Sequence, residues 1–232
     1  LLVNGVPIAR LDAAMIDSIA ALVEAGTPLA DWPAGWFHVD NNIRTGGLLL
    51  NDDLAAGDGL RAMLARGAAD TLSEIIRSGL RGRGGAGFST GMKWQFCREA
   101  RGDTHYVVCN ADEGEPGTFK DRILLRSHAD TVFEGMTVCA AAIGAKQGFL
   151  YLRGEYRYLL PQLEAVLARR RELGLLGGNI LGQPGFDFDI EIAVGAGAYI
   201  CGEESALIES LEGKRGVPRN RPPFPVTHGY LG

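Results

Sequence analysis

A glycine-rich, basic segment at residues 78–94 carries the residue types that could bind an anion. It contains six glycines, two arginines and one lysine. Glycine allows positive φ angles and close approach of a ligand to the backbone amides, and nearby cations add positive potential. The spacing Gly82-x-Gly84-x-x-Gly87 fits a dinucleotide-binding loop, although this motif alone is weak. We predict a phosphate cradle here. The alternative, a flexible linker, is disfavoured because Phe88 and Trp94 are interleaved with the glycines.

The elements around this loop differ from the usual dinucleotide-binding unit, in which the glycines follow a strand. Residues 70–79 have a helical pattern, with Asp70 or Thr71 as the predicted N-cap. Residues 94–99 are predicted to continue after the loop as a helix whose N-terminus faces the glycines. Because a helix N-terminus attracts anions, this arrangement also favours phosphate binding.

Two further polar segments follow predicted strands. Residues 105–110 are rich in β-branched and aromatic residues and lead into an acidic turn at 111–117. Residues 186–192 alternate with period two and lead into a glycine-rich segment that ends at Gly202. Ligands of open α/β sheets bind at the carboxyl ends of the strands, so the polar residues at these positions are candidate site residues.

Strands and helices alternate along the chain, which predicts an α/β fold. We expect a Rossmann-like, largely parallel sheet flanked by helices at residues 67–232, and an irregular, helical N-terminal extension and linker at residues 1–66. The further predicted elements are helices at 11–25, 59–66, 131–144, 156–173 and 203–211, a strand at 148–153 and a short connection or strand at 41–50. The basic run at 169–171 is predicted to be a solvated last helical turn, and the Pro-rich segment 213–232 is predicted to be an extended strap that could cover a site.

The composition is that of a globular protein with 232 residues, 46% hydrophobic and 22% charged. A net charge of −5 argues against a nucleic-acid-binding protein, and the local basic clusters favour a small anionic ligand. No apolar run reaches the roughly 20 residues needed to cross a bilayer, and no signal sequence begins the chain. Cys97, Cys109, Cys139 and Cys201 form no C-x-x-C pair, so we expect core cysteines, no metal in this chain, and a cytoplasmic protein.

Four segments together resemble the NADH-oxidising flavoprotein subunit of complex I and its relatives, over roughly residues 70–232. These segments are Gly79–Phe88, Cys109–Thr118, Gly195–Glu204 and Pro222–Pro225. The relatives include the diaphorase subunit of NAD-reducing hydrogenases and the β subunit of NAD-dependent formate dehydrogenases. The segments at 42–46 and 219–226 resemble these two more closely than complex I.

The resemblance implies that one site binds FMN and NADH. The residues implied to bind the phosphate and ribityl region of FMN are Gly82, Arg83, Gly84, Gly85 and Lys93, and those implied to line the flavin are Asn110, Asp112, Glu113, Gly202, Glu203 and Glu204. The residues implied to bind NADH are Phe88, Phe96 and Phe224, as stacking partners of the adenine, with Glu115, Tyr199 and Arg221 nearby. No acid–base side chain is expected to be indispensable, since hydride transfer takes place on FMN.

The residue types allow these roles, but simpler interpretations remain open. Lys93 is a compact cation that can pair with a phosphate, whereas Asp112 and Glu113 suit hydrogen-bond donors such as hydroxyl or ring N–H groups. Phe88 and Phe96 could instead be ordinary core residues. Glu203 and Glu204 could complement the dipole of the helix that they begin, worth about 0.3–1 kcal/mol, and both roles can coexist.

The resemblance further implies that electrons leave FMN singly, towards iron–sulfur subunits of a hydrogenase, a formate dehydrogenase or a complex I-like assembly. In this family an Asn-Asn-Val-Glu-Thr-type stretch, a ubiquitin-like domain and a helical bundle with a [4Fe–4S] cluster follow, and this sequence contains none of them. We therefore expect the chain to be part of a longer subunit. The alternatives are a nucleotide-binding module without redox chemistry and a module that serves only in assembly.

Overall fold

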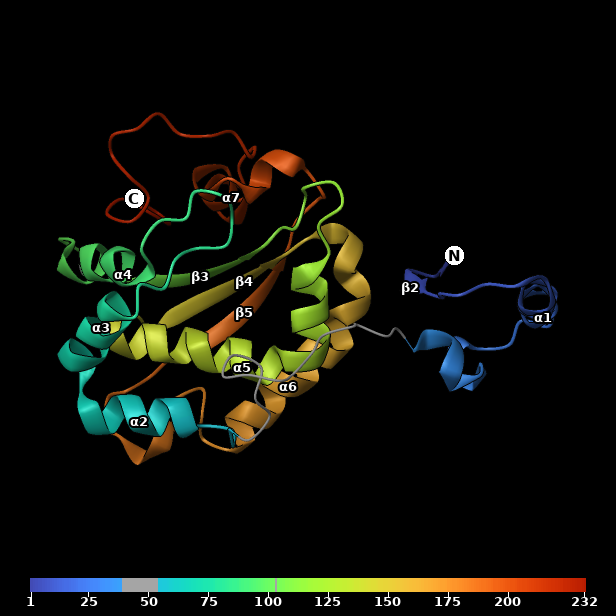
Figure 1. Ribbon diagram of the computed structural model, residues 1–232, viewed down its shortest axis with the longest axis horizontal. Helices are drawn as coiled ribbons and strands as arrows, with labels where there is room; N and C mark the ends of the chain where they lie inside the picture. The colour runs from blue at the N-terminus through green and yellow to red at the C-terminus, as the bar shows by residue number, and fades with distance from the viewer. Residues whose placement is uncertain (39–53, 103) are drawn as a thin grey trace. The chain divides into compact units, whose positions relative to one another are not determined.

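The computed structural model describes residues 1–38, 54–102 and 104–232 (Figure 1). The chain divides into two compact units, residues 1–50 and 51–232. The sequence predicts a boundary at residue 66. Helix α2 (Asp58–Arg66), however, contributes the fully buried Leu60 to the core of the second unit. The segment predicted at 41–50 lies outside the described residues.

The first unit is a small helical and irregular assembly. It comprises β1 (Leu2–Val3), β2 (Val6–Pro7), α1 (Ala13–Glu24) and the 3-10 helices η1 (Leu29–Asp31) and η2 (Ala34–Phe37). Asp12 caps α1, accepting a hydrogen bond from the amide of Met15 at 2.8 Å. Ile8, Ile19 and Trp32 form the small core of this unit. The helix predicted at 11–25 is confirmed by α1.

The second unit contains a parallel three-stranded sheet in the order β3 (Tyr106–Ala111), β4 (Gln147–Leu152), β5 (Asp189–Val194). Helix α5 (Lys120–Ile143) connects β3 to β4. The 3-10 helix η3 (Gly154–Leu159), α6 (Leu160–Glu172) and η4 (Ile180–Gly182) lie between β4 and β5. Both connections are βαβ crossovers, which a parallel pairing requires. The predicted α/β class with a parallel sheet flanked by helices is confirmed.

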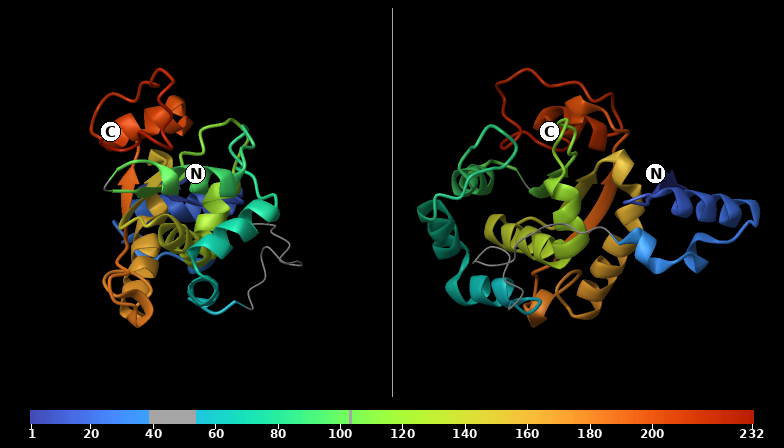
Figure 2. Two further views of the ribbon diagram at one scale, coloured as in Figure 1. Left: turned by 90° about the vertical axis from the view of Figure 1, so that its left-hand side faces the viewer. Right: turned by 45° about the vertical axis from the view of Figure 1, so that its right-hand side comes forward.

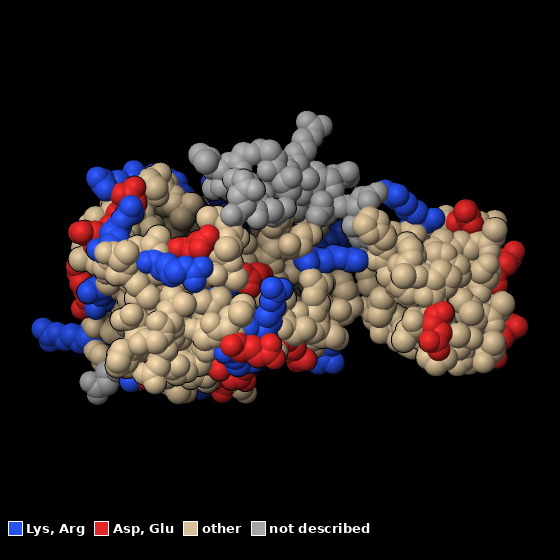
Figure 3. Space-filling view, turned by 90° about the horizontal axis from the view of Figure 1, so that it is seen from below, with Lys and Arg blue, Asp and Glu red and all other residues tan. Residues whose placement is uncertain are grey.

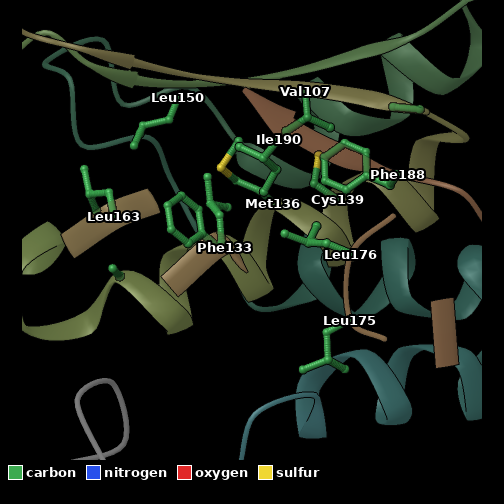
Figure 4. Close-up of a cluster of buried hydrophobic side chains, with 14 of the residues drawn as sticks. Val107, Phe133, Met136, Cys139, Leu150, Leu163, Leu175, Leu176, Phe188 and Ile190 are labelled. Atoms are coloured by element: carbon green, nitrogen blue, oxygen red, sulfur yellow. The ribbon is translucent and has the colours of Figure 1, made fainter. Parts of the chain in front are cut away.

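The two faces of the sheet bury different side chains, because successive residues of a strand point to opposite faces. Leu150 and Leu152 of β4 belong to the main core with α5 and α6, and Figure 4 shows Phe133 and Met136 of α5 in the same cluster. On the opposite face, Tyr151 packs with the cluster that includes Leu207 of α7 (Glu204–Leu211). Burial on both faces fits a central parallel strand.

Several helices begin earlier than their sequence patterns predicted. The predicted N-cap at Asp70 or Thr71 is wrong, because α3 (Ala68–Arg77) starts directly after Gly67, whose φ of 88° separates it from α2. Ser89 caps α4 (Thr90–Glu99), so this helix begins four residues before the predicted start. Helix α5 begins eleven residues before the predicted Thr131. The first two residues of α3 and of α4 are small or polar and so gave no helical signal. The missed part of α5 contains Ile123, Leu124 and Leu125, but the non-helical φ of −135° at His128 separates it from the predicted helix.

The basic run 169–171 is not a uniformly solvated turn, so the prediction is wrong for its central residue. Arg170 is fully buried, with Nη2 at 2.8 Å from Glu134 Oε2 and Nη1 at 3.0 Å from Asp130 Oδ1, both on α5. Glu134 also accepts hydrogen bonds from the amides of Gly57 and Leu60 at 2.9 and 3.0 Å. This buried network joins α6, α5 and the N-terminus of α2.

Replacing Arg170 should therefore destabilise the second unit, since Glu134 would stay buried without its cation. We expect Arg170→Met to lower the free energy of unfolding by about 3 kcal/mol, measured by urea denaturation. The matched control is Arg169→Met, because Arg169 is its exposed neighbour, and it should change stability by less than about 0.5 kcal/mol. Equal effects of the two substitutions would contradict this role of Arg170.

Candidate functional site

The candidate site lies at the carboxyl edge of the sheet, because the three strands are paired in register. Ala111 of β3 pairs with Leu152 of β4, and Leu152 pairs with Val194 of β5. The acidic turn, Arg153 and the glycine-rich segment 195–202 therefore leave the sheet side by side. Figure 1 shows the loop that follows β3 and the segment that leads to α7 beyond the same end of the sheet. This is where open α/β sheets bind ligands.

The acidic turn and the entrance to α7 are in direct contact. Asn110 Nδ2 donates to the carbonyl of Gly202 at 2.8 Å. A Cβ atom on Gly202 would lie 3.4 Å from the carbonyl oxygen of Asp112, and one on Gly114 would lie 3.2 Å from the ring of Tyr199. Two of the three predicted segments are thus brought together, and a larger residue at Gly114 would crowd Tyr199 of the neighbouring segment.

The glycine loop is closed at its base and open at its tip. Arg81 donates to the carbonyl of Gly87 at 2.9 Å, and the amide of Gly82 donates to the carbonyl of Phe88 at 2.9 Å. A Cβ on Gly84, Gly85 or Gly87 would meet no atom within 4 Å. Gly85 has φ of 97°, which a residue with a side chain rarely adopts. The loop tip therefore presents accessible backbone, as a ligand cradle requires.

Ion pairs connect this loop and the Pro-rich strap to the start of α7. Lys93 of α4 lies 2.6 Å from Glu204, and Arg221 of the strap pairs with both Glu203 and Glu204. Glu203 also caps α7, accepting from the amides of Ser205 and Ala206 at 3.0 Å. Glu203 therefore caps α7 and also lies where it complements the helix dipole, the alternative considered from the sequence. The loop, the strap and the acidic turn all meet the α7 entrance.

Exposed aromatic side chains lie on the segments that surround this edge. Phe88 and Phe96 have ring centroids 6.5 Å apart and are 52% and 39% exposed, so neither is a core residue. Tyr199 donates to Glu115 at 2.6 Å, and this hydrogen bond raises the pKa of Tyr199. Phe224 of the strap is also exposed, but no ring contact joins it to the other two phenylalanines within the described residues.

The carboxylate of Glu113 is buried and is satisfied by hydrogen bonds within the protein. It accepts from the amides of Asp121 and Arg122 at the start of α5, at 2.8 and 3.4 Å. Tyr156 donates to the same carboxylate at 2.8 Å, and burial first, then this hydrogen bond, raises the pKa of Tyr156. Glu113 thus caps α5 from a distance. Tyr156 and the nearby Arg153 were missed by the sequence analysis, although both follow the carboxyl end of β4.

Asp112 is the carboxylate that the protein leaves without a partner. Its side chain is buried, and neither carboxylate oxygen has a hydrogen bond within the described structure. Burial raises its pKa, opposed by the positive charge of Arg153. A buried polar group without a partner is costly. This group therefore fits a ligand with hydroxyl or ring N–H donors, such as the ribityl chain or isoalloxazine of FMN, as the accessible glycine loop fits its phosphate.

A separate cavity of about 340 Å³ lies at the other end of β3. Arg101, His105 and Tyr230 are among its lining residues, and none of the predicted site residues lines it. The four cysteines are free, and none of their thiols takes part in the contacts described above. Burial raises the pKa of Cys109 to about 12, which agrees with its interpretation as an unreactive small residue.

The contrast between Glu113 and Glu115 gives a stability test. Glu113→Gln replaces one of the two accepting oxygens by an NH2 group, which cannot accept from the N–H or O–H donors that face it. This substitution should lower the free energy of unfolding by about 1–3 kcal/mol. The matched variant Glu115→Gln alters an exposed carboxylate and should change stability by less than about 0.5 kcal/mol. Urea denaturation of both variants at neutral pH measures the difference. Similar losses would show that Glu113 is no more structural than Glu115.

Comparison with known sequences identifies relatives for most of the chain. Residues 75–231 match the family described as Complex1_51K, the Nuo51 FMN-binding domain. The NAD-reducing hydrogenase HoxS subunit alpha of Cupriavidus necator is 54% identical over 212 residues, covering 90% of this chain and 35% of that protein. An NADH-quinone oxidoreductase subunit of Rhizobium meliloti is 52% identical over 178 residues, covering 75% of this chain and 42% of that protein.

The structural comparison agrees. A crystal structure of an NAD+-reducing [NiFe]-hydrogenase in the H2-reduced state aligns with a TM-score of 0.86 at 51% identity, covering 100% of this chain and 39% of that one. The chain thus spans about two fifths or less of the length of these relatives. The resemblance drawn from the four sequence segments, including the similarity to the hydrogenase branch, is confirmed. The chain belongs to the family of Nuo51 FMN-binding domains.

Proposed function

We propose that this chain is the FMN- and NAD(H)-binding module of a redox complex. The observation that carries the proposal is the convergence of the glycine loop, the acidic turn and the α7 entrance at one sheet edge, around the unpartnered carboxylate of Asp112. Membership of an FMN-binding family and similarity to NAD-reducing and NADH-oxidising proteins support it.

The phosphate of FMN is assigned to the loop tip and to the N-terminal turn of α4. The groups that would bind it are the backbone of Gly82, Gly84 and Gly85 and the cations Arg83 and Lys93. Lys93 is paired with Glu204, but the two side chains are 50% and 37% exposed, and such pairs contribute only about 0–1 kcal/mol. A phosphate dianion in reach of loop amides offers more charge, so it can compete with Glu204.

The flavin ring and ribityl chain are assigned to the carboxyl edge of the sheet. Asn110, Asp112 and Gly202 line this edge from two segments, with Glu113, Glu203 and Glu204 supporting it. NADH is assigned to the outer side, where its adenine would stack on exposed aromatic rings. The residues proposed there are Phe88, Phe96, Phe224, Glu115, Tyr199 and Arg221.

When bound, FMN supplies the chemistry, accepting hydride from the nicotinamide and passing electrons on singly. The residues of this chain bind and orient the two ligands, and none is assigned a proton transfer. We propose iron–sulfur subunits of a hydrogenase, formate dehydrogenase or complex I-like assembly as electron partners.

Within the described residues, no helix has the length and hydropathy to span a bilayer. The face in Figure 3 shows basic and acidic side chains interspersed. With four free cysteines, we propose a cytoplasmic location.

FMN titration followed by an activity assay tests the proposal. We expect the chain to quench flavin fluorescence on binding, to show flavin absorbance, and to reduce ferricyanide in the presence of NADH. FMN binding without NADH-dependent reduction would instead support a nucleotide-binding module. Absence of FMN binding would contradict the proposal and leave a role in assembly.

Lys93→Ala should weaken FMN binding at least about tenfold, because it removes a charge-assisted contact to the phosphate. Fluorescence titration with FMN, and with riboflavin as the phosphate-free ligand, measures this effect. The substitution should leave riboflavin binding nearly unchanged. The control is Lys146→Ala, an exposed lysine directly before β4 at the opposite edge of the sheet. Equal FMN affinity of the Lys93 variant and the parent chain would remove Lys93 from the phosphate site.

Phe88→Ala should mainly raise the apparent KM for NADH, by about tenfold, since stacking on a base contributes about 1–3 kcal/mol. Steady-state ferricyanide reduction with FMN in excess measures KM and kcat separately. Leu173→Ala is the control, because Leu173 is similarly exposed (51%) but caps α6 away from the site. An unchanged KM, or a loss of kcat alone, would exclude Phe88 from the adenine pocket.

A further inference from the structure

Arg153 follows the last residue of the central strand and makes contacts that converge on the acidic turn. Its backbone amide donates to the carbonyl of Ala111 at 3.2 Å, and its guanidinium donates to the carbonyl of Glu113. These two carbonyls flank Asp112 in the chain. The side chain is only 25% exposed, and its planar fork suits simultaneous contacts to two acceptors.

The second branch of the guanidinium is held by Glu155, at 2.8 Å from Nη2. Glu155 in turn lies against the glycine-rich segment, because a Cβ on Gly197 would approach its carboxylate to 3.0 Å. Arg153 and Glu155 therefore connect the acidic turn to the segment that leads to α7. Tyr156, the next residue along the chain, adds its hydrogen bond to the carboxylate of Glu113.

We propose that Arg153 is a positioning residue of the flavin site, which fixes the main chain of the acidic turn and keeps the Asp112 carboxylate charged as an acceptor for FMN. This inference rests on the proposed function. Its basis is geometric: the guanidinium contacts the turn directly, and the buried Asp112 carboxylate has no hydrogen-bond partner in the described structure.

The charges around Asp112 determine the direction of the effect. Burial raises the pKa of Asp112, the positive charge of Arg153 lowers it, and the negative charge of Glu155 raises it. Tyr151 lies near it on β4, and Gly202 approaches it from the α7 side. Glu113 follows Asp112 in the acidic turn, and Glu203 follows Gly202 at the start of α7. Both carboxylates already accept hydrogen bonds from helix amides. Among the described residues, Arg153 is thus the cation that acts on Asp112.

An ionised Asp112 accepts hydrogen bonds from FMN, so FMN affinity should fall as the pH drops through the pKa of this carboxyl group. Removing Arg153 raises that pKa, and so affinity should be lost at a higher pH. Removing Glu155 has the opposite electrostatic effect and should move the loss to lower pH. General destabilisation would not shift the pH at which affinity is lost in opposite directions for the two substitutions.

The experiment is a fluorescence titration with FMN, and in parallel with riboflavin, which lacks the phosphate that itself titrates at about pH 6. It covers a series of acidic to neutral pH values, with circular dichroism to verify folding. Arg153→Met should shift the midpoint upward by about one pH unit and weaken binding at neutral pH. Glu155→Gln should shift the midpoint downward. Arg153→Lys should restore most of the midpoint, because it restores the charge, but not the full affinity, because it lacks the fork. Arg157→Met is the control, since Arg157 is exposed on η3.

Asp112→Asn assigns the titration, because the midpoint measured with riboflavin should disappear in this variant. An unchanged midpoint in Arg153→Met, even with weaker binding, would overturn the inference and reduce Arg153 to a structural residue. If Arg153→Met does not fold, a midpoint in Glu155→Gln that is unchanged or shifted upward overturns it as well. Failure of the parent chain to bind FMN at any pH would instead overturn the proposed function, and this inference with it.

Discussion

The in-register pairing of three parallel strands is the constraint on which the site depends. Ala111, Leu152 and Val194 are the last residues of their strands and are paired in register, so the three following connections leave the sheet side by side. Each then has to satisfy its own backbone groups where the ladder stops. They do so through one another, since Arg153 donates to the acidic turn and Asn110 donates to Gly202. A shift of one strand by a single residue would separate these partners and reverse its buried face.

The packing beneath the sheet explains why this edge can be so polar. Helices α5 and α6 cover one face and α7 the other, and Figure 2 shows this arrangement from two further directions. Arg170 and Glu134 anchor α6, α5 and α2 at a buried ion network. The strap is tied to α7 by Arg219, which pairs with Glu209 and Glu212. The exposed edge therefore rests on elements that are fixed elsewhere, as a preorganised site requires.

The sequence predicted the class of fold, the parallel sheet and the meeting of the polar segments, because these follow from periodicity and from the place of strand ends in α/β folds. It did not predict which charges are buried. Arg169, Arg170 and Arg171 are identical in type, but the phase of α6 turns only Arg170 into the interior. Helix starts were placed too late because the first residues of α3 and α4 are small or polar and because the non-helical His128 interrupts α5. Arg153 and Tyr156 were missed because their partners are distant in sequence and include a backbone carbonyl.

The five carboxylates of the proposed site make different interactions, which residue type alone does not predict. Glu113 and Glu203 accept from helix amides, so each fixes the start of the helix that follows it. Glu115 and Glu204 pair with exposed partners, Tyr199 and Lys93, and these weaker interactions can be exchanged for ligand contacts. Of these five, only Asp112 is both buried and unpartnered. Since the other four are engaged, a ligand bound as proposed between the segments would meet Asp112 as the acceptor whose hydrogen-bonding capacity is still unused. The hydrogen bonds gained there would offset the cost of burying that group.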